Sequence, residues 1–196
     1  MIEGLDPEEA RRLLDPALHV MMDAVHRYEG TVNQVLGDGI MALFGAPVAH
    51  EDHAVRACYA ALAMQTAMRR YAEEVRRSHG LEMQARVGLH SGEVVVRAIG
   101  NDLHMDYSAV GQTTHLAARM EQLALPGSIR LTAATLRLAE GLVQVRGRGI
   151  VDAGGVHARI GRSRGSGHRY SHGAARCGDP LHRCPRARRH LHAFAV

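Results

Sequence analysis

The sequence has few cysteines and no long hydrophobic run, and both shortages exclude classes of protein. Three cysteines in 196 residues are an odd number and do not form a disulfide framework. The longest nearly uninterrupted apolar run covers residues 40–49, well short of the ~18 residues that predict a membrane span. The amino terminus, MIEGLDPEEARR, is acidic and lacks the apolar segment of a secretory signal. We therefore expect a cytoplasmic protein.

Lysine is absent altogether, since all 24 basic residues are arginines. The net charge of +4 is unevenly distributed along the chain. Residues 1–150 hold 15 arginines against 18 acidic residues, whereas residues 151–196 hold nine arginines against Asp152 and Asp179. The basic character thus belongs to the carboxyl-terminal segment. An apolar content of 46% is ordinary for a soluble globular protein, and 196 residues suffice for one domain with a core.

Hydrophobic periodicity predicts alternating helices and strands as far as about residue 149. Two short helices, each opened by an Asp-Pro pair, are expected before residue 28. Further helices are predicted over 53–77, 112–123 and 134–139. Strands are predicted over 31–36, 40–44, twice within 84–100, and over 105–110, 129–132 and 142–145. Because hairpins interrupt the alternation, the pattern favours an α+β sandwich over a doubly wound sheet.

The segment after residue 149 shows no apolar periodicity. Arg, His, Gly and Ala make up 29 of its last 46 residues. We expect residues 1–149 to form one domain and residues 150–196 to be a disordered tail or an out-of-frame translation. Cys177 and Cys184 lie among histidines, but their spacing fits no compact zinc module. Nucleic-acid binding through the basic tail remains an alternative function, although the tail lacks interleaved aromatic residues.

A predicted hairpin over residues 33–47, NQVLGDGIMALFGAP, places the single carboxylate of Asp38 between two glycines. Asp-Gly flanked by hydrophobic residues is a strong hairpin signal, so Asp38 serves the turn on this evidence alone. A turn can also present a carboxylate to a metal ion. The local sequence leaves both interpretations open.

The predicted helix over residues 112–123 separates polar from apolar positions. His115 and Arg119 are four residues apart and share one face. Leu116, Met120 and Leu123 are expected on the opposite, buried face. Taken alone, His115 and Arg119 are equally well explained as solvated helix residues.

Four stretches, in this order and spacing, together resemble the catalytic domains of class III nucleotide cyclases, most closely the bacterial adenylate cyclases. They are GDGIMALFGAPVAHEDHAVRACYAALAMQ (37–65), RVGLHSGEVVVRAIG (86–100), MDYSAVGQTTHLAARMEQLA (105–124) and PGSIRLTAATLRLAEG (126–141). The resemblance covers roughly residues 6–146. It implies a ferredoxin-like α/β sandwich with a mostly antiparallel sheet and a head-to-tail homodimer. It also implies conversion of ATP into cyclic AMP and pyrophosphate with two Mg²⁺ or Mn²⁺ ions. From the short apolar runs we expect no membrane partner, and from the composition of the tail we do not favour a nucleic-acid partner.

The resemblance assigns roles to five residues. Asp38 matches the family's second metal-binding aspartate, and Arg119 matches the arginine that stabilises charge developing on the α-phosphate. His115 falls where most members have an asparagine that orients the ribose. Gln34 falls where many have the lysine that contacts adenine, and Ser108 where they have Asp or Thr. Glutamine can donate to adenine N1 and serine can accept from its amine, which favours ATP.

The family's first metal-binding aspartate has no counterpart among these motifs. The resemblance places it on an opening strand before the first helix, where this sequence has Met1-Ile2-Glu3. Asp6 and Asp15 fall at predicted helix caps and do not match the motif. We therefore expect a cyclase domain of impaired activity. The alternative is a nucleotide-binding or dimerisation module that does not turn over.

Overall fold

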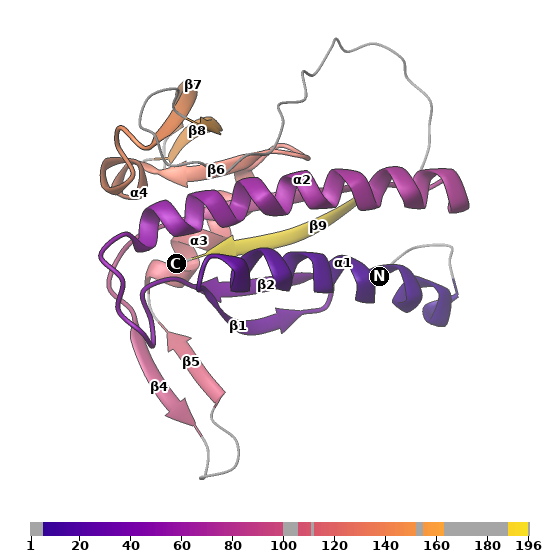
Figure 1. The fold of residues 1–196 in the computed structure, drawn as a ribbon, viewed down its shortest axis with the longest axis horizontal. Coiled ribbons are helices and arrows are strands. Elements are labelled where there is room, and N and C mark those ends of the chain that lie inside the picture. Colours follow the sequence, from indigo (N-terminus) through magenta and orange to yellow (C-terminus); the bar gives the residue numbers. More distant parts are fainter. Residues whose placement is uncertain (1–5, 100–105, 111, 152–154, 163–187, 196) are drawn as a thin grey trace.

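A mixed seven-stranded sheet carries helices on both faces in the computed structural model, which describes residues 6–99, 106–110, 112–151, 155–162 and 188–195. The strand order is β1-β2-β9-β3-β6-β8-β7, and β4 and β5 form a separate two-stranded ribbon. Figure 1 shows α1 and α2 in front of the sheet, α3 behind it, and the β4–β5 ribbon projecting from the body. The predicted α+β sandwich is confirmed.

The helices and strands follow the sequence expectations closely up to residue 145. The helices are α1 (Pro7–Arg27), α2 (His53–His79), α3 (Gln112–Leu123) and α4 (Ala133–Leu138). The strands are β1 (Thr31–Leu36), β2 (Gly39–Leu43), β3 (Glu82–Leu89), β4 (Val95–Ile99), β5 (Asp106–Val110), β6 (Ile129–Thr132), β7 (Val143–Val151), β8 (Gly155–Arg162) and β9 (Arg188–Ala195).

Helix α1 is one continuous helix, whereas the sequence predicts two. Pro16 lies inside it and removes one backbone donor from the helical ladder. The apolar stripe of α1 is buried against the core along its whole length, and this packing outweighs the lost hydrogen bond. Tyr71 of α2 donates a hydrogen bond to the Leu13 carbonyl at 2.7 Å, one turn before the proline.

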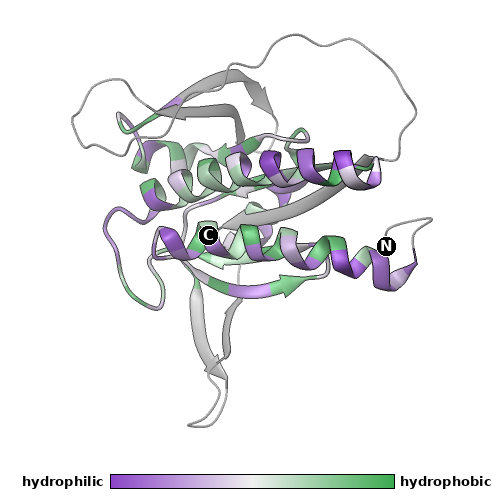
Figure 2. Ribbon diagram, turned by 45° about the vertical axis from the view of Figure 1, so that its right-hand side comes forward, coloured by the Kyte–Doolittle hydropathy of each residue, from purple (hydrophilic) through white to green (hydrophobic). Residues whose placement is uncertain are grey.

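The main core lies between the sheet and the pair α1 and α2. Met21, Ile40, Cys58, Leu89 and Leu131 are fully buried there. Figure 2 shows hydrophobic and hydrophilic residues alternating along both helices, as expected for helices with one buried face. None of the helices in the described ranges is both long and apolar enough to cross a bilayer.

Gln65 is the buried polar residue that ties α2 to the sheet. Its Nε2 donates to the carbonyl of Ala85 on β3 at 2.9 Å and to that of Ser128, just before β6, at 3.2 Å. A buried amide with both partners satisfied stabilises a unique helix position, because any shift would leave buried polar groups unpaired.

Strands β8 and β9 lie in the segment for which the sequence predicts no regular structure. Strand β8 has a period-two alternation of Val156, Ala158 and Ile160, which the composition of the segment obscures. Pairing with β6 and β7 satisfies its backbone groups. Residues 163–187, including Cys177 and Cys184, lie outside the described ranges.

The sheet is mixed, whereas the resemblance implies a mostly antiparallel one. Strand β9 lies between β2 and β3 and is parallel to both. The β3–β6 pair is also parallel, and β1–β2, β6–β8 and β7–β8 are antiparallel. Strand β9 therefore joins the β1–β2 hairpin to the rest of the sheet.

Candidate active site

Helix α3 carries two of the predicted site residues on its exposed face. His115 and Arg119 are both exposed, one helical turn apart. The opposite face is formed by four buried residues: Thr113, Ala117, Met120 and Glu121. Leu116 and Leu123, which the sequence places on the buried face, are only partly buried. The buried face of α3 is therefore not the apolar stripe that the sequence predicts, and it includes the charged residue Glu121.

Backbone contact holds α3 against β3 at Gly88. A β-carbon at this position would lie 2.2 Å from the Glu121 nitrogen and 2.4 Å from the Ala117 oxygen. Real β-carbons do not approach other atoms so closely, so glycine is required here for the helix to pack on the strand.

Three polar contacts hold α3, one in its first turn and two in its last turn. In the first turn, Thr113 Oγ1 donates to the Glu93 carbonyl at 2.6 Å. Farther along, Arg86 Nε on β3 lies 2.9 Å from Glu121 Oε1 in an ion pair whose carboxylate side chain is only 6% exposed. At the last turn, the buried Arg130 donates from Nη1 to a helix carbonyl. Together these contacts set the position of the helix.

Arg130 on β6 occupies the carboxyl end of α3. Its Nη1 donates to the Leu123 carbonyl at 2.7 Å, and the residue is 2% exposed. Burial lowers the pKa of Arg130 from its ordinary value because the charged guanidinium loses hydration. A cation at the end of a helix also interacts favourably with the helix dipole. Arg130 is therefore a buried cap for α3.

The β1–β2 hairpin carries Gln34 and Asp38, as predicted. Gln34 is exposed opposite Met41, directly after a register shift at Asn33 that gives β1 a bulge. Bulges re-aim the neighbouring side chains of a strand. Asp38 is half-buried in the turn, where Gly37 has a φ of 61°. The positive φ of the turn explains why residue 37 is a glycine. The turn places the Asp38 carboxylate at the end of the hairpin.

Strand β5 carries Ser108, which pairs with Arg97 of β4. The side chain of Ser108 lies outside the described part of the structure. Strand β5 contacts both β1 and α3. One chain therefore brings the strand of Gln34, the strand of Ser108 and the helix of His115 and Arg119 into one neighbourhood.

The described residues do not provide a complete ligand set for two metal ions. No three His, Cys, Asp or Glu side chains among them are placed to hold a metal. Strand β9, the neighbour of β2, contains no Asp or Glu. Mg²⁺ sites depend on carboxylate and phosphate oxygens, so Asp38 alone does not make a metal centre within the described part of this chain.

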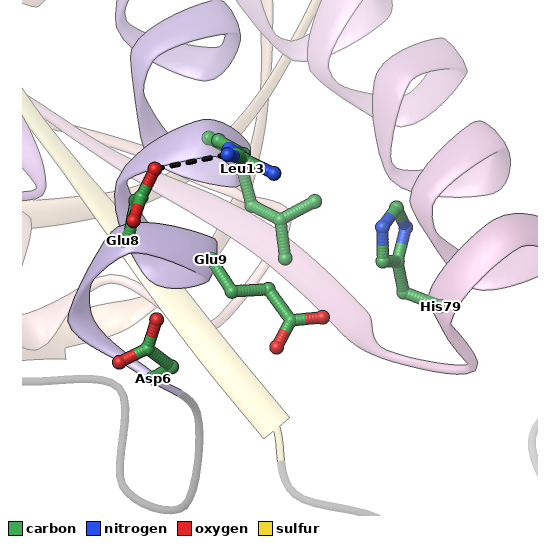
Figure 3. Close-up of a pocket in the computed structure, with 6 residues that line it drawn as sticks. Asp6, Glu8, Glu9, Leu13 and His79 are labelled. Atoms are coloured by element: carbon green, nitrogen blue, oxygen red, sulfur yellow. Dashed lines mark hydrogen bonds and ion pairs between the residues drawn. The ribbon is translucent and has the colours of Figure 1, made fainter.

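A concave region lies near the amino end of α1. Its lining includes Asp6, Glu8, Glu9 and His79. The Glu8 carboxylate accepts a hydrogen bond from Arg12, one turn along the same helix, as the dashed line in Figure 3 shows. Acidic residues in the first turn are stabilised by the helix dipole. Their presence is thus explained without a ligand.

Three residues that hold α3 are not singled out by the sequence patterns: Arg86, Gly88 and Glu121. Arg86 lies on the other face of its strand from the apolar alternation of Ala85 and Val87, and Glu121 is one of several polar residues in its helix. Neither charge therefore stands out in the sequence as a residue that needs a buried partner.

The fold agrees with the comparisons to known proteins. The family model described as "Adenylate and Guanylate cyclase catalytic domain" matches residues 1–164. The chain therefore belongs to the family of class III nucleotide cyclase catalytic domains, which confirms the resemblance seen in the sequence.

Individual relatives include proteins named as adenylate cyclases and proteins named as guanylate cyclases. Adenylate cyclase 1 of Rhizobium meliloti is 34% identical over 119 residues, which are 61% of this chain and 18% of that protein. The guanylyl cyclase Cya2 is 33% identical, with a TM-score of 0.67 and coverage of 79% of this chain and 80% of its own. The adenylyl cyclase CyaB from P. aeruginosa is 27% identical, with a TM-score of 0.71 and coverage of 83% and 87%. The chain spans about a fifth of the length of the curated relatives it matches.

Proposed function

We propose that this chain is an adenylate cyclase domain that converts ATP into cyclic AMP and pyrophosphate at the interface of a cytoplasmic homodimer. The observation that carries the proposal is the exposed face of α3, where His115 and Arg119 stand one turn apart on a helix anchored by its other face. A guanidinium carried by an anchored helix is suited to stabilise a phosphoryl transition state.

In this reaction the ribose 3′-oxygen attacks the α-phosphorus, a new O–P bond forms, and the bond to pyrophosphate breaks. The 3′-hydroxyl loses its proton, and negative charge develops on the α-phosphoryl oxygens and on the leaving pyrophosphate. Arg119 donates to these oxygens, and His115 donates one hydrogen bond to the ribose. Gln34 and Ser108 contact the adenine, and these contacts select ATP over GTP.

The proposed dimer is head-to-tail, so that each active site combines residues of two subunits. One subunit supplies Asp38 as a ligand for Mg²⁺ or Mn²⁺, and the other supplies the residues on α3, Gln34 and Ser108. The projecting β4–β5 ribbon is an argument for a dimer. An isolated two-stranded ribbon is marginally stable in water, so contact with a partner chain would stabilise it.

We expect turnover to be low because the described ligand set is incomplete. Loss of one group that organises a transition state commonly costs at least ~3 kcal/mol, or about a hundredfold in rate. The same observation favours a second candidate function, a nucleotide-binding or dimerisation module without turnover.

The test is cyclic nucleotide formation by the purified chain from Mn·ATP and Mn·GTP, measured by mass spectrometry over long incubations. We expect cyclic AMP in excess of cyclic GMP, loss of product in Asp38→Ala, and a 100- to 1000-fold loss, as an order of magnitude, in Arg119→Ala. Arg137→Ala is the matched control, because Arg137 is an exposed arginine on α4.

The two candidate functions give different results in this assay. Saturable binding of Mn·ATP without any product would support the binding module. Product formation that is unaffected by both Asp38→Ala and Arg119→Ala would show that the active site is assigned to the wrong residues.

A further inference from the structure

Glu121 is a buried carboxylate on the same helix as the proposed catalytic arginine. It is 4% exposed and forms an ion pair with Arg86, a residue of β3. We propose that Glu121, held by Arg86, is a positioning residue that sets the rotation of α3 and thereby aims Arg119 into the active site. This inference rests on the proposed function.

The helical geometry links the two side chains. Successive residues of an α-helix are about 100° apart, so Arg119 and Glu121, two positions apart, point to nearly opposite sides. The side of α3 that faces β3 therefore determines where Arg119 points. Fixing Glu121 against Arg86 turns Arg119 toward solvent, as its exposure shows.

Other contacts of α3 also restrain its rotation, since Ala117 and Met120 are buried on the same face, but apolar packing has no preferred direction. The close approach at Gly88 sets the distance between helix and strand. Thr113 and Arg130 bond at the two ends of the helix and resist sliding along its axis. Among the directional contacts of the described residues of α3, the ion pair lies nearest in sequence to Arg119, two residues away. A buried charge that loses its partner is strongly unfavourable, so the pair favours one rotational setting.

The first experiment reads the helix directly, without activity. Hydrogen–deuterium exchange is measured by mass spectrometry on the purified chain and on Glu121→Gln, which preserves size and removes the charge. We expect amides of α3 to exchange at least tenfold faster in the variant, with α1 and α2 unchanged. Glu73→Gln is the control, because it breaks an exposed ion pair with Arg76 on α2. Exchange on α3 that does not change, or that changes equally throughout the fold, would overturn the proposal.

The second experiment asks whether Glu121 acts through Arg119. Cyclic AMP formation is compared in Arg119→Ala, Glu121→Gln and the double variant, with rates corrected for the folded fraction. We expect Glu121→Gln to lower kcat about a hundredfold with little change in KM, because a misplacement of about 1 Å has this effect. The double variant should be no slower than Arg119→Ala alone.

The outcomes of the cycle separate the two proposals. Additive losses would show that Glu121 acts by another route, and an unchanged kcat in Glu121→Gln would refute the positioning role. Arg86→Lys keeps the charge and should retain more activity than Glu121→Gln. If Arg119→Ala leaves turnover unchanged, then Arg119 does not have the catalytic role proposed for it. The positioning role of Glu121 would then be refuted as well. Exchange on α3 would still report whether the ion pair holds the helix.

Discussion

Replacement of Gly88 by alanine tests the packing on which α3, the helix of the proposed active-site residues, depends. The new β-carbon would lie 2.2 Å from the Glu121 nitrogen, whereas ordinary contacts begin at 3.4 Å. The atoms that it meets belong to the backbone of α3, so no side-chain rotation can relieve the overlap. The helix has to move away from β3 by roughly 1.2 Å, the difference between these two distances.

This displacement should lower both stability and activity. Overpacking of this kind costs ~1–3 kcal/mol of the free energy of unfolding. The displaced helix carries the proposed catalytic residues His115 and Arg119 with it, and a misplacement of about 1 Å can lower rates about a hundredfold. Activity should therefore fall further than the loss of folded protein accounts for.

Urea denaturation gives the change in stability, and cyclic AMP formation gives the change in rate. Gly80→Ala is the matched control, because Gly80 has a φ of 68° at the end of α2 and no atom lies within 4 Å of the position that its new β-carbon would take. Strain should cost that variant about 1 kcal/mol without moving α3. A Gly88→Ala protein with the stability and activity of the parent chain would refute the reasoning.

Three further predictions concern other parts of the fold. Gln65→Ala should lower the free energy of unfolding by ~1–3 kcal/mol in urea denaturation, because two hydrogen bonds and the packing of a buried side chain are lost; an unchanged midpoint would contradict this. Burial raises the pKa of the Cys58 thiol to about 12, so iodoacetamide at pH 8 should label Cys58 only after unfolding; rapid labelling of the native protein, detected by peptide mass spectrometry, would show the thiol to be accessible. Deletion of β9 should produce aggregation, measured by light scattering, because edges of β2 and β3 lose their partner; a monodisperse and equally stable variant would show that β9 is dispensable.

Local patterns predict most elements of the fold before residue 146. The Asp-Gly turn, the helix of residues 112–123 and the strand of residues 129–132 have the expected bounds. These elements depend on periodicity and turn chemistry, which are visible over a short window. The continuity of α1 through Pro16 is not visible in such a window, because it depends on packing against α2, a contact between distant parts of the chain.

The site could be predicted only in part for the same reason. The exposed positions of Gln34, His115 and Arg119 follow from hairpin and helix periodicity. The buried ion pair between Arg86 and Glu121 could not be derived that way, because the two residues belong to elements that meet only in the folded protein. The family resemblance assigns roles to individual residues, whereas the contacts that hold α3 in place emerge from the tertiary structure.

The central place of β9 has a consequence for how the protein acquires its fold during synthesis. Glu82 pairs with Arg188, so more than a hundred residues separate partners in the middle of the sheet. Contacts of such long range form slowly, because a large loop has to close before they contribute. While the ribosome is still translating the intervening residues, the β1–β2 hairpin and β3 have no strand between them. The nascent chain therefore exposes two unpaired strand edges for much of its synthesis, and this is the stage at which chaperones would be needed.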